Sequence, residues 1–200
     1  MPEAPVLMVG NDESAVETEL VAGQLSCPSC REQLGPWGHA RVRVLRRRGG
    51  EEDRLRPRRG RCRGCGKTHV LLGDEALLRR RDEVAVIGEA IEAKAAGVGH
   101  RRIAVLLDVP AWKVRRWLRR FSERAVEIYE HFSRWSFALD ISLSPSGPGK
   151  GPFVDALEAI GATARAAVLR HGPRPAWCFV SFASGGLLLA NTRCPLPPVP

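Results

Sequence analysis

The chain has 200 residues, with 31 lysines and arginines against 22 aspartates and glutamates, and a net charge of +9. This length suits one ordinary domain or two small ones, and it excludes a large catalytic fold joined to a DNA-binding module. The positive charge favours a polyanionic partner, nucleic acid before an anionic membrane. No apolar run approaches the ~20 residues of a membrane span, and the first ten residues lack an export signal. We therefore expect a cytoplasmic protein with no membrane partner.

The charge is unevenly distributed along the chain. Residues 1–20 carry five acids and no lysine or arginine, whereas residues 31–120 carry 24 basic and 11 acidic residues. The first twenty residues also lack aromatic side chains and a steady apolar period. We expect them to form a disordered acidic tail, because they cannot bury enough apolar surface to fold.

Two CxxC pairs, Cys27 with Cys30 and Cys62 with Cys65, are separated by 31 residues. Each pair can hold one edge of a metal ion, and four thiolates complete the tetrahedral shell that zinc prefers. Two disulfides are the alternative, but they are typical of secreted domains. The sequence therefore predicts a structural Zn²⁺ site within a zinc ribbon at residues 21–76.

The residues around the cysteines favour tight turns. Pro28 fixes one backbone angle, and Gly64 and Gly66 allow positive backbone angles that would aim amide groups at sulfur. His69 and His39 are near enough in sequence to compete as ligands. Four cysteines already complete the shell, so we interpret both histidines as surface or hydrogen-bonding side chains.

Three strands are predicted inside the ribbon. Residues 40–45 alternate valine with Arg41 and Arg43, which predicts a half-buried strand with its arginines outward. A turn follows at residues 49–50, then a return strand at 53–61 that Pro57 makes an edge strand, and a third strand at 68–72. The arginine run 46–48 is either a solvated loop neutralised by the acids at 51–53 or a phosphate contact.

The apolar spacing in residues 80–121 predicts three helices. The first extends from an N-cap at Asp82 to a stop at Gly97, the second spans residues 100–107, and the third begins after Pro110 and spans residues 111–121. The last two are joined by a very short turn, which is the arrangement of a helix-turn-helix.

The third helix separates apolar from cationic side chains. Its apolar stripe is predicted to consist of Val114, Trp117, Leu118 and Phe121. The opposite side carries Trp112, Lys113, Arg115, Arg116, Arg119 and Arg120. No acid interrupts it, which favours a DNA-recognition helix over a merely basic surface helix.

Individual roles follow from helical position. We expect Lys113 and Arg116, with Trp112, to face base edges, and Arg115, Arg119 and Arg120 to contact phosphates. Arg101 and Arg102, at the start of the second helix, complete the predicted set of DNA-binding residues.

The segment GHRRIAVLLDVP at residues 99–110, followed by VRRWLRRF at 114–121, resembles the homeodomain-like helix-turn-helix of bacterial insertion-sequence transposases and resolvases. The knuckle CRGCGKTH at residues 62–69 resembles the zinc ribbon that precedes this helix-turn-helix in several transposase groups. The resemblance covers residues 25–121 and implies the DNA-binding region of such a protein. Asp108 stands where the family usually has glycine, and aspartate tolerates a left-handed turn better than most residues.

Such transposases continue into a nuclease-like domain whose carboxylates hold two magnesium ions, but only about 80 residues follow Phe121 here. Asp140, Asp155 and Glu158 are the obvious carboxylates, and no strand pattern frames them. We interpret them as helix-surface residues and as partners of a helix N-terminus. The expected role is therefore non-enzymatic, either a transposition accessory or a transcriptional regulator. Its partners would be double-stranded DNA and a separate transposase or a second copy of the chain.

The C-terminal half is predicted to be mainly helical, which makes the fold α+β. We expect an amphipathic helix at residues 122–140 that packs within the chain rather than pairing with a second copy, and a linker at 141–152. Residues 153–200 are expected to form a helix, then either a small hairpin or a helical turn and a strand. Cys178 and Cys194 lack partners at ligand spacing, so we expect buried or idle thiols.

Two other functions compete with DNA binding. The first is an RNA- or ribosome-associated zinc-ribbon protein, in which the arginine-rich hairpin is the main binder and the helices only support it. The second is a metal-dependent nuclease or recombinase that uses Asp140, Asp155 and Glu158.

Overall fold

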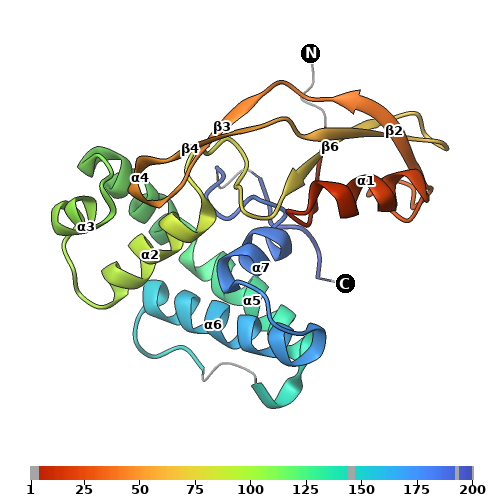
Figure 1. Cartoon of the computed structure of the whole chain (residues 1–200). Helices are drawn as coiled ribbons and strands as arrows, with labels where there is room; N and C mark the ends of the chain where they lie inside the picture. The colour runs from red at the N-terminus through yellow and green to blue at the C-terminus, as the bar shows by residue number, and fades with distance from the viewer. Residues whose placement is uncertain (1–4, 144–146, 192–193, 200) are drawn as a thin grey trace.

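A computed structural model of the protein describes residues 5–143, 147–191 and 194–199. It joins a small β-region to a larger helical region and is α+β, as the sequence predicts (Figure 1). One sheet has the strand order β1-β6-β5-β2, and β3 and β4 form a separate hairpin. The strands are β1 (Val6–Val9), β2 (Leu34–His39), β3 (Arg43–Arg46), β4 (Glu52–Leu55), β5 (Arg58–Cys62) and β6 (Thr68–Gly73).

The described residues contain seven α-helices and two short 3-10 turns. The helices are α1 (Glu13–Val21), α2 (Val84–Ala95), α3 (His100–Leu107), α4 (Ala111–Glu123), α5 (Ala125–Leu139), α6 (Pro152–His171) and α7 (Ala176–Ala183), with 3-10 turns η1 (Arg48–Gly50) and η2 (Ile141–Leu143). One continuous apolar core joins α2 to α7, and two smaller cores lie against the four-stranded sheet.

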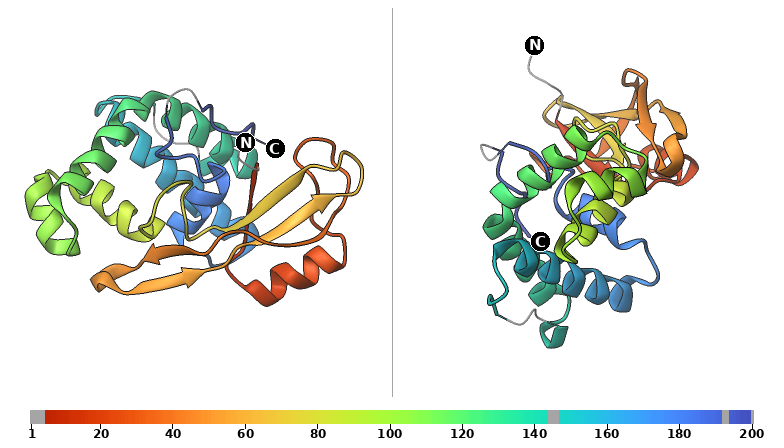
Figure 2. Two further views of the ribbon diagram at one scale, coloured as in Figure 1. Left: turned by 90° about the horizontal axis from the view of Figure 1, so that it is seen from above. Right: turned by 90° about the vertical axis from the view of Figure 1, so that its left-hand side faces the viewer.

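The four-stranded sheet is covered on both faces. Successive side chains of a strand point to opposite faces, so Leu71 packs with Val16 and Leu20 of α1, while Leu72 packs with Met8 and Leu45 in the other small core. In Figure 2, α1 lies on one side of the sheet and the bulk of the helices on the other. The sheet therefore connects α1 to the helical region.

The expectation of a disordered tail at residues 1–20 is wrong for residues 5–20, and residues 1–4 lie outside the described ranges. Residues 6–9 form β1, which pairs in parallel with β6. Asp12 caps α1 by accepting hydrogen bonds from the backbone N–H groups of Ser14 and Ala15. Arg58 forms an ion pair with Glu17 at 2.5 Å. These long-range partners order the segment. Its own sequence, which is short and acidic, does not indicate that it folds.

The predicted ribbon strands need two corrections. The return strand divides at Pro57, and its second half, β5, is a central strand between β6 and β2 rather than an edge strand. The buried and exposed faces of β3 are the reverse of the prediction, which placed the valines inward and the arginines outward. Leu45 is fully buried and Arg43 donates to the carbonyls of Leu77 and Arg80, whereas Val42 is exposed. Arg43 therefore points inward because the backbone carbonyls of Leu77 and Arg80, in the segment after β6, accept its hydrogen bonds.

Helices α2, α3 and α4 contact one another and begin or end within a few residues of the predicted bounds. Asp82 does not cap α2, because the N-cap is Glu83 and makes no side-chain cap bond. Asp82 is buried and accepts a hydrogen bond from Lys113 at 2.8 Å. At Gly88 an added Cβ would lie 2.1 Å from the ring of Trp177, so glycine permits α2 and α7 to approach closely.

The C-terminal region packs on these helices as the amphipathic pattern predicts. The α5 side chains Ala125, Ile128 and Phe132 are buried in the large core, and α5 packs along α6. Residues 144–146 of the predicted linker, and residues 192–193 and 200, lie outside the described ranges. Residues 176–183 form α7, which Gly185 and Gly186 follow, and residues 187–190 form turns rather than the predicted hairpin or strand.

Candidate metal centre and cationic helix face

The two CxxC loops are built from matching hydrogen bonds. In the first, the Arg31 N–H donates to the Cys27 carbonyl at 2.9 Å, and in the second the Gly66 N–H donates to the Cys62 carbonyl at 3.2 Å. Both donors have a positive φ, 68° at Arg31 and 70° at Gly66. The sequence identifies Gly66 but not Arg31, because arginine is rarely left-handed.

Gly64 is needed for a different reason from the one predicted. It is not among the glycines with positive φ, but a Cβ at this position would lie 2.8 Å from the Glu32 side chain. The first loop therefore packs against the second, which brings the four cysteines together.

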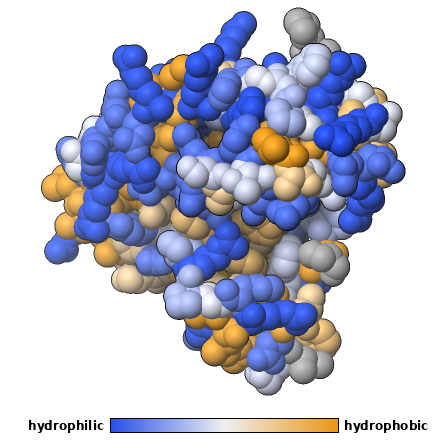
Figure 3. Space-filling model, turned by 45° about the vertical axis from the view of Figure 1, so that its right-hand side comes forward, coloured by the Kyte–Doolittle hydropathy of each residue, from blue (hydrophilic) through white to orange (hydrophobic). Residues whose placement is uncertain are grey.

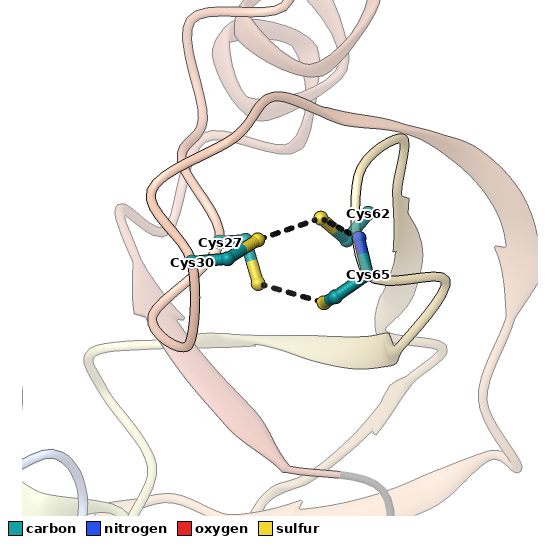
Figure 4. A group of neighbouring side chains, drawn as sticks. All are labelled: Cys27, Cys30, Cys62 and Cys65. Atoms are coloured by element: carbon teal, nitrogen blue, oxygen red, sulfur yellow. Dashed lines mark hydrogen bonds between the residues drawn. The ribbon is translucent and has the colours of Figure 1, made fainter.

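The four cysteine sulfurs form one compact group. All four Sγ atoms lie within 4.8 Å of one another, and the pairs Cys27–Cys65 and Cys30–Cys62 are 3.8 and 3.3 Å apart (Figure 4). A tetrahedral ion with metal–sulfur bonds of about 2.3 Å requires sulfurs roughly 3.8 Å apart. The group therefore fits a single tetrahedral metal ion such as zinc, with two ligands from each loop.

Neighbouring groups donate hydrogen bonds that would stabilise thiolates. The backbone N–H of Cys65 lies 3.4 Å from the Cys62 sulfur. Against the effect of burial, the backbone amides of Cys65 and Gly64 lower the pKa of the Cys62 thiol, whereas the Cys30 thiol, which shares a hydrogen bond with Cys62, has its pKa raised to about 11. Thiolates are the form that binds metal, so these donors favour ion binding.

His69 is a neighbour of the metal site rather than a competing ligand. It is fully buried, and its Nε2 lies 3.4 Å from the Cys27 sulfur. The prediction of a hydrogen-bonding histidine is therefore confirmed, and a surface position is excluded. A histidine ring nitrogen beside a candidate ligand sulfur is typical of the groups that orient metal ligands. His39 is exposed and takes no part in the sulfur group.

The turn between α3 and α4 has the predicted left-handed residue. Asp108 has φ 51° and ψ 48°, and the Val109 N–H donates to the Ala104 carbonyl at 3.0 Å. This hydrogen bond closes the end of α3, and Pro110 then starts α4 in a new direction.

Helix α4 has the two faces that the sequence predicts. The buried residues are Val114, Trp117, Leu118 and Phe121. The exposed ones include Trp112, Arg115, Arg116 and Arg119, and Arg101 and Arg102 are exposed in the first turn of α3. Trp112 is 65% exposed, which is unusual for so large an aromatic side chain.

Two of the predicted DNA-binding residues, Lys113 and Arg120, are not on the exposed face of α4. The Lys113 side chain is only 13% exposed in its ion pair with Asp82, so it faces the start of α2 rather than solvent. Arg120 is half-buried, and its Nε has no hydrogen-bond partner within the described residues. Arg119 forms an exposed ion pair with Glu123 at 3.5 Å.

Arg80 belongs to the same cationic region, although sequence reasoning does not identify it. Its pKa is lowered, first by burial and then by the charges of Arg120 and Arg116. Its guanidinium donates to the Leu189 carbonyl at 2.5 Å. Arg80 lies before α2 in the chain, so no helical spacing relates it to α4.

The arginine run of the β3–β4 hairpin is paired with acids. Arg46 bonds to Glu52, and Arg48 to Glu89 of α2. Arg47 contacts three carboxylates, those of Asp53, Glu75 and Glu83. Local neutralisation is therefore observed, and three of these five carboxylates, Glu75, Glu83 and Glu89, come from outside the predicted acidic loop.

Each of the three carboxylates considered for catalysis has local partners, and Asp155 is buried in the first turn of α6 rather than on the helix surface. Asp140 accepts hydrogen bonds from Ser142, Asp155 from the backbone N–H groups of Gly149 and Lys150, and Glu158 forms an ion pair with Lys150. Within the described residues, the four cysteines are the one group of three or more potential ligands that lie close enough for a single metal ion.

The other two cysteines lie apart from this group. Cys178 is buried, which raises the pKa of its thiol to about 11, and Cys194 is exposed. None of the helices in the described ranges combines the length and apolarity of a bilayer-crossing segment. On the face shown in Figure 3, hydrophilic side chains predominate around separate apolar patches.

Comparison with known proteins gives one similarity. Residues 27–106 match the model of a family described as a domain of unknown function, DUF6431. The matched segment begins at the first metal-site cysteine and ends within α3. Neither a curated protein nor a solved structure matches the chain.

Proposed function

We propose that the protein binds double-stranded DNA through a helix-turn-helix made of α2, α3 and α4, beside a ribbon held by structural Zn²⁺. The observation that carries this proposal is the outer face of α4, where Trp112, Arg115 and Arg116 are exposed and no acid precedes Glu123. Arginines on one helix face can contact bases and phosphates together in a major groove.

The arrangement of the three helices supports the same function. They share one core, and the left-handed turn at Asp108 places α4 directly after the short α3. In a helix-turn-helix, the later helix enters the groove while the earlier one crosses the backbone. Arg101 and Arg102, in the first turn of α3, are then suited to phosphate contacts.

The roles within α4 follow from exposure. Arg116 and Trp112 face base edges and Arg115 contacts phosphates, whereas Arg119 is paired with Glu123. Lys113 is removed from the base-reading set, because its ion pair with Asp82 holds it against α2. That ion pair instead fixes the angle between α2 and α4, and thus the direction in which the cationic face points.

Zinc has a structural role in this proposal. The sulfur group joins the loop before β2 to the loop after β5, and it packs against the core under α1. Bound zinc would supply folding free energy to a β-region that is too small to fold on its own core.

The proposed biological role is that of a transposition accessory or transcriptional regulator, since the sequence resembles the DNA-binding region of insertion-sequence transposases. Asp140, Asp155 and Glu158 do not form a group of potential metal ligands within the described residues, which supports a binding role.

The test is site selection on random duplexes, followed by affinity measurements on the selected site. We expect Arg116→Ala to weaken binding about 5- to 150-fold and to relax the preference at one base pair. Arg115→Ala should weaken binding to all duplexes alike and reduce the salt slope by about one.

Two matched controls make the test specific. Arg165 is exposed on α6, and Arg54 is exposed on β4 of the arginine-rich hairpin. Alanine at either position should leave duplex affinity within about twofold. A larger loss from Arg54→Ala than from Arg116→Ala would contradict the proposal and favour the hairpin as the main nucleic-acid binder.

A further inference from the structure

Trp37 is an exposed aromatic residue on β2, an edge strand of the four-stranded sheet. Among the described strands, β2 pairs only with β5. The β2–β5 register shifts between Pro36 and His39, so Trp37 lies in a bulge of the edge strand. Bulges turn side chains out of the regular pleat, and Trp37 remains 52% exposed. A large exposed aromatic side chain at a bulge suggests an interaction surface.

Arg61 holds the indole ring in place. Its guanidinium carbon lies 4.5 Å from the centre of the Trp37 ring, and its Nε donates to the Gly66 carbonyl at 3.3 Å. The same Gly66 closes the second metal loop. A cation over one face of an indole is attracted to it and restricts its motion. The tryptophan is thus pre-oriented by a residue anchored in the metal site.

A shallow hollow of about 470 Å³ lies beside this pair. It is lined by Trp37, Arg61 and Arg63 and by the small residues Gly35, Gly64 and Gly66. The glycines leave backbone accessible, and the two arginines supply positive charge. A flat base could enter such a hollow with its phosphate near a guanidinium.

The surrounding charge matches a polyanion. Arg31, Arg61, Arg63 and Lys67 are exposed at this end of the sheet, and none forms an ion pair with any of the described residues. The side chain of Glu32 packs against Gly64 at the same end. The arginine run 46–48 of the hairpin differs, since each of its three arginines is paired with a carboxylate.

We propose that the ribbon end carries a second nucleic-acid site, in which an unpaired base of single-stranded DNA stacks on Trp37 while Arg61 and Arg63 contact its phosphates. Bases in a duplex are stacked on one another, so a tryptophan ring can stack only on a base that is unpaired or displaced. β2 lies at the end of the sheet far from α3 and α4 (Figure 1). The site does not depend on duplex binding by α4.

The test uses fluorescence anisotropy with the full zinc-loaded chain and three labelled probes. These are an oligothymidine of about 12 nucleotides, an oligouridine of equal length, and a duplex that contains the selected α4 site. Trp37→Ala should weaken oligothymidine binding about 5- to 100-fold, and Trp37→Phe should retain most of it. Duplex binding by Trp37→Ala should stay within about twofold.

Trp112→Ala is the matched control, because Trp112 is the other strongly exposed tryptophan, at 65% against 52%. It should reduce duplex binding and leave oligothymidine binding unchanged, whereas Trp37→Ala does the reverse. Metal content and the thermal unfolding midpoint should be unchanged in both variants, which separates binding from folding.

Three results would overturn the proposal. The first is an oligothymidine affinity of Trp37→Ala within twofold of the wild-type value. The second is a loss of affinity in Trp37→Ala that is equal for oligothymidine and for the duplex. The third is Trp37-dependent binding of oligouridine without oligothymidine, which would assign the site to RNA. Failure of the α4 proposal appears separately, as duplex binding that is insensitive to Arg116→Ala.

Discussion

The hairpin arginines and the α4 arginines are alike in sequence and differ in their partners. Arg47 has three carboxylate partners within hydrogen-bond or ion-pair distance, and its side chain is 33% exposed. Arg115 and Arg116 form no ion pair with any residue in the described ranges. A dense arginine run can therefore either join parts of a fold or remain free for a ligand, and the deciding factor is whether acids face it.

Arg124 extends this comparison to the protein interior. Its side chain is 1% exposed, it forms an ion pair with Glu127, and it donates to the carbonyls of Leu187 and Cys194. Its donors point at the C-terminal segment or at Glu127 of α5. Side-chain exposure rises from Arg124 through Arg47 to Arg116. We therefore expect substitution to cost the most unfolding free energy at Arg124 and the most DNA affinity at Arg116.

The largest stability effect is expected at Arg124. Arg124→Met removes a buried cation and leaves Glu127 and two carbonyls without their donor, which should cost about 3–5 kcal/mol of unfolding free energy. Urea unfolding measures this loss, and limited proteolysis should show that residues 187–191 and 194–196 become accessible. A loss below about 1 kcal/mol would contradict the structural role given to Arg124.

A smaller loss is expected at Arg47, with Arg48 as the control. Arg47→Ala leaves Glu75 and Glu83, whose side chains are 13% and 19% exposed, without their cation. We expect it to cost about 2 kcal/mol in urea unfolding. Arg48 is 68% exposed in its pair with Glu89, so Arg48→Ala should cost under about 0.5 kcal/mol.

The duplex affinity of the same two variants tests the other half of the comparison. Both should keep wild-type affinity for the selected duplex, because neither arginine is free for phosphate. If Arg48→Ala lowered duplex affinity as strongly as Arg116→Ala, the distinction between paired and unpaired arginines would fail.

Features set by local spacing could be predicted from the sequence. Each CxxC turn, the bounds of α3, the buried stripe of α4 and the left-handed Asp108 depend on residues within a few positions of one another. A helix face follows from a 3.6-residue period, and a metal loop follows from a CxxC turn.

Features set by distant partners could not be predicted. Residues 6–9 become a strand only because β6 offers a parallel partner. Arg43 is turned inward by the carbonyls of Leu77 and Arg80, and Lys113 by the carboxylate of Asp82. The stacking of Arg61 on Trp37 likewise depends on the pairing of β2 with β5, which no short-range pattern reveals.

The smallest predicted effect concerns two glutamates that respond to acid in opposite ways. Hydrogen bonds from Arg124 lower the pKa of Glu127, whereas burial raises the pKa of Glu83 in spite of Arg47. The unfolded chain therefore takes up the Glu127 proton first, so stability from Glu127 is present above about pH 4.5 and is lost as pH falls through its folded pKa. At Glu83 the folded chain takes up the proton first, so the cost of burying its charge is relieved as pH falls toward 4.5.

Each contribution is on the order of 1 kcal/mol or less after allowance for solvent screening. Urea unfolding between pH 7 and pH 3 should show that Glu127→Gln flattens the loss below pH 4.5. Glu83→Gln should instead remove the gain in unfolding free energy that the wild-type chain shows as pH falls toward 4.5. Glu130→Gln, in an exposed pair with Arg134 on the same helix as Glu127, is the control and should leave the profile unchanged. Profiles with the same slope in all three variants would show that the Arg47 and Arg124 pairs do not differ in burial as the exposed fractions imply.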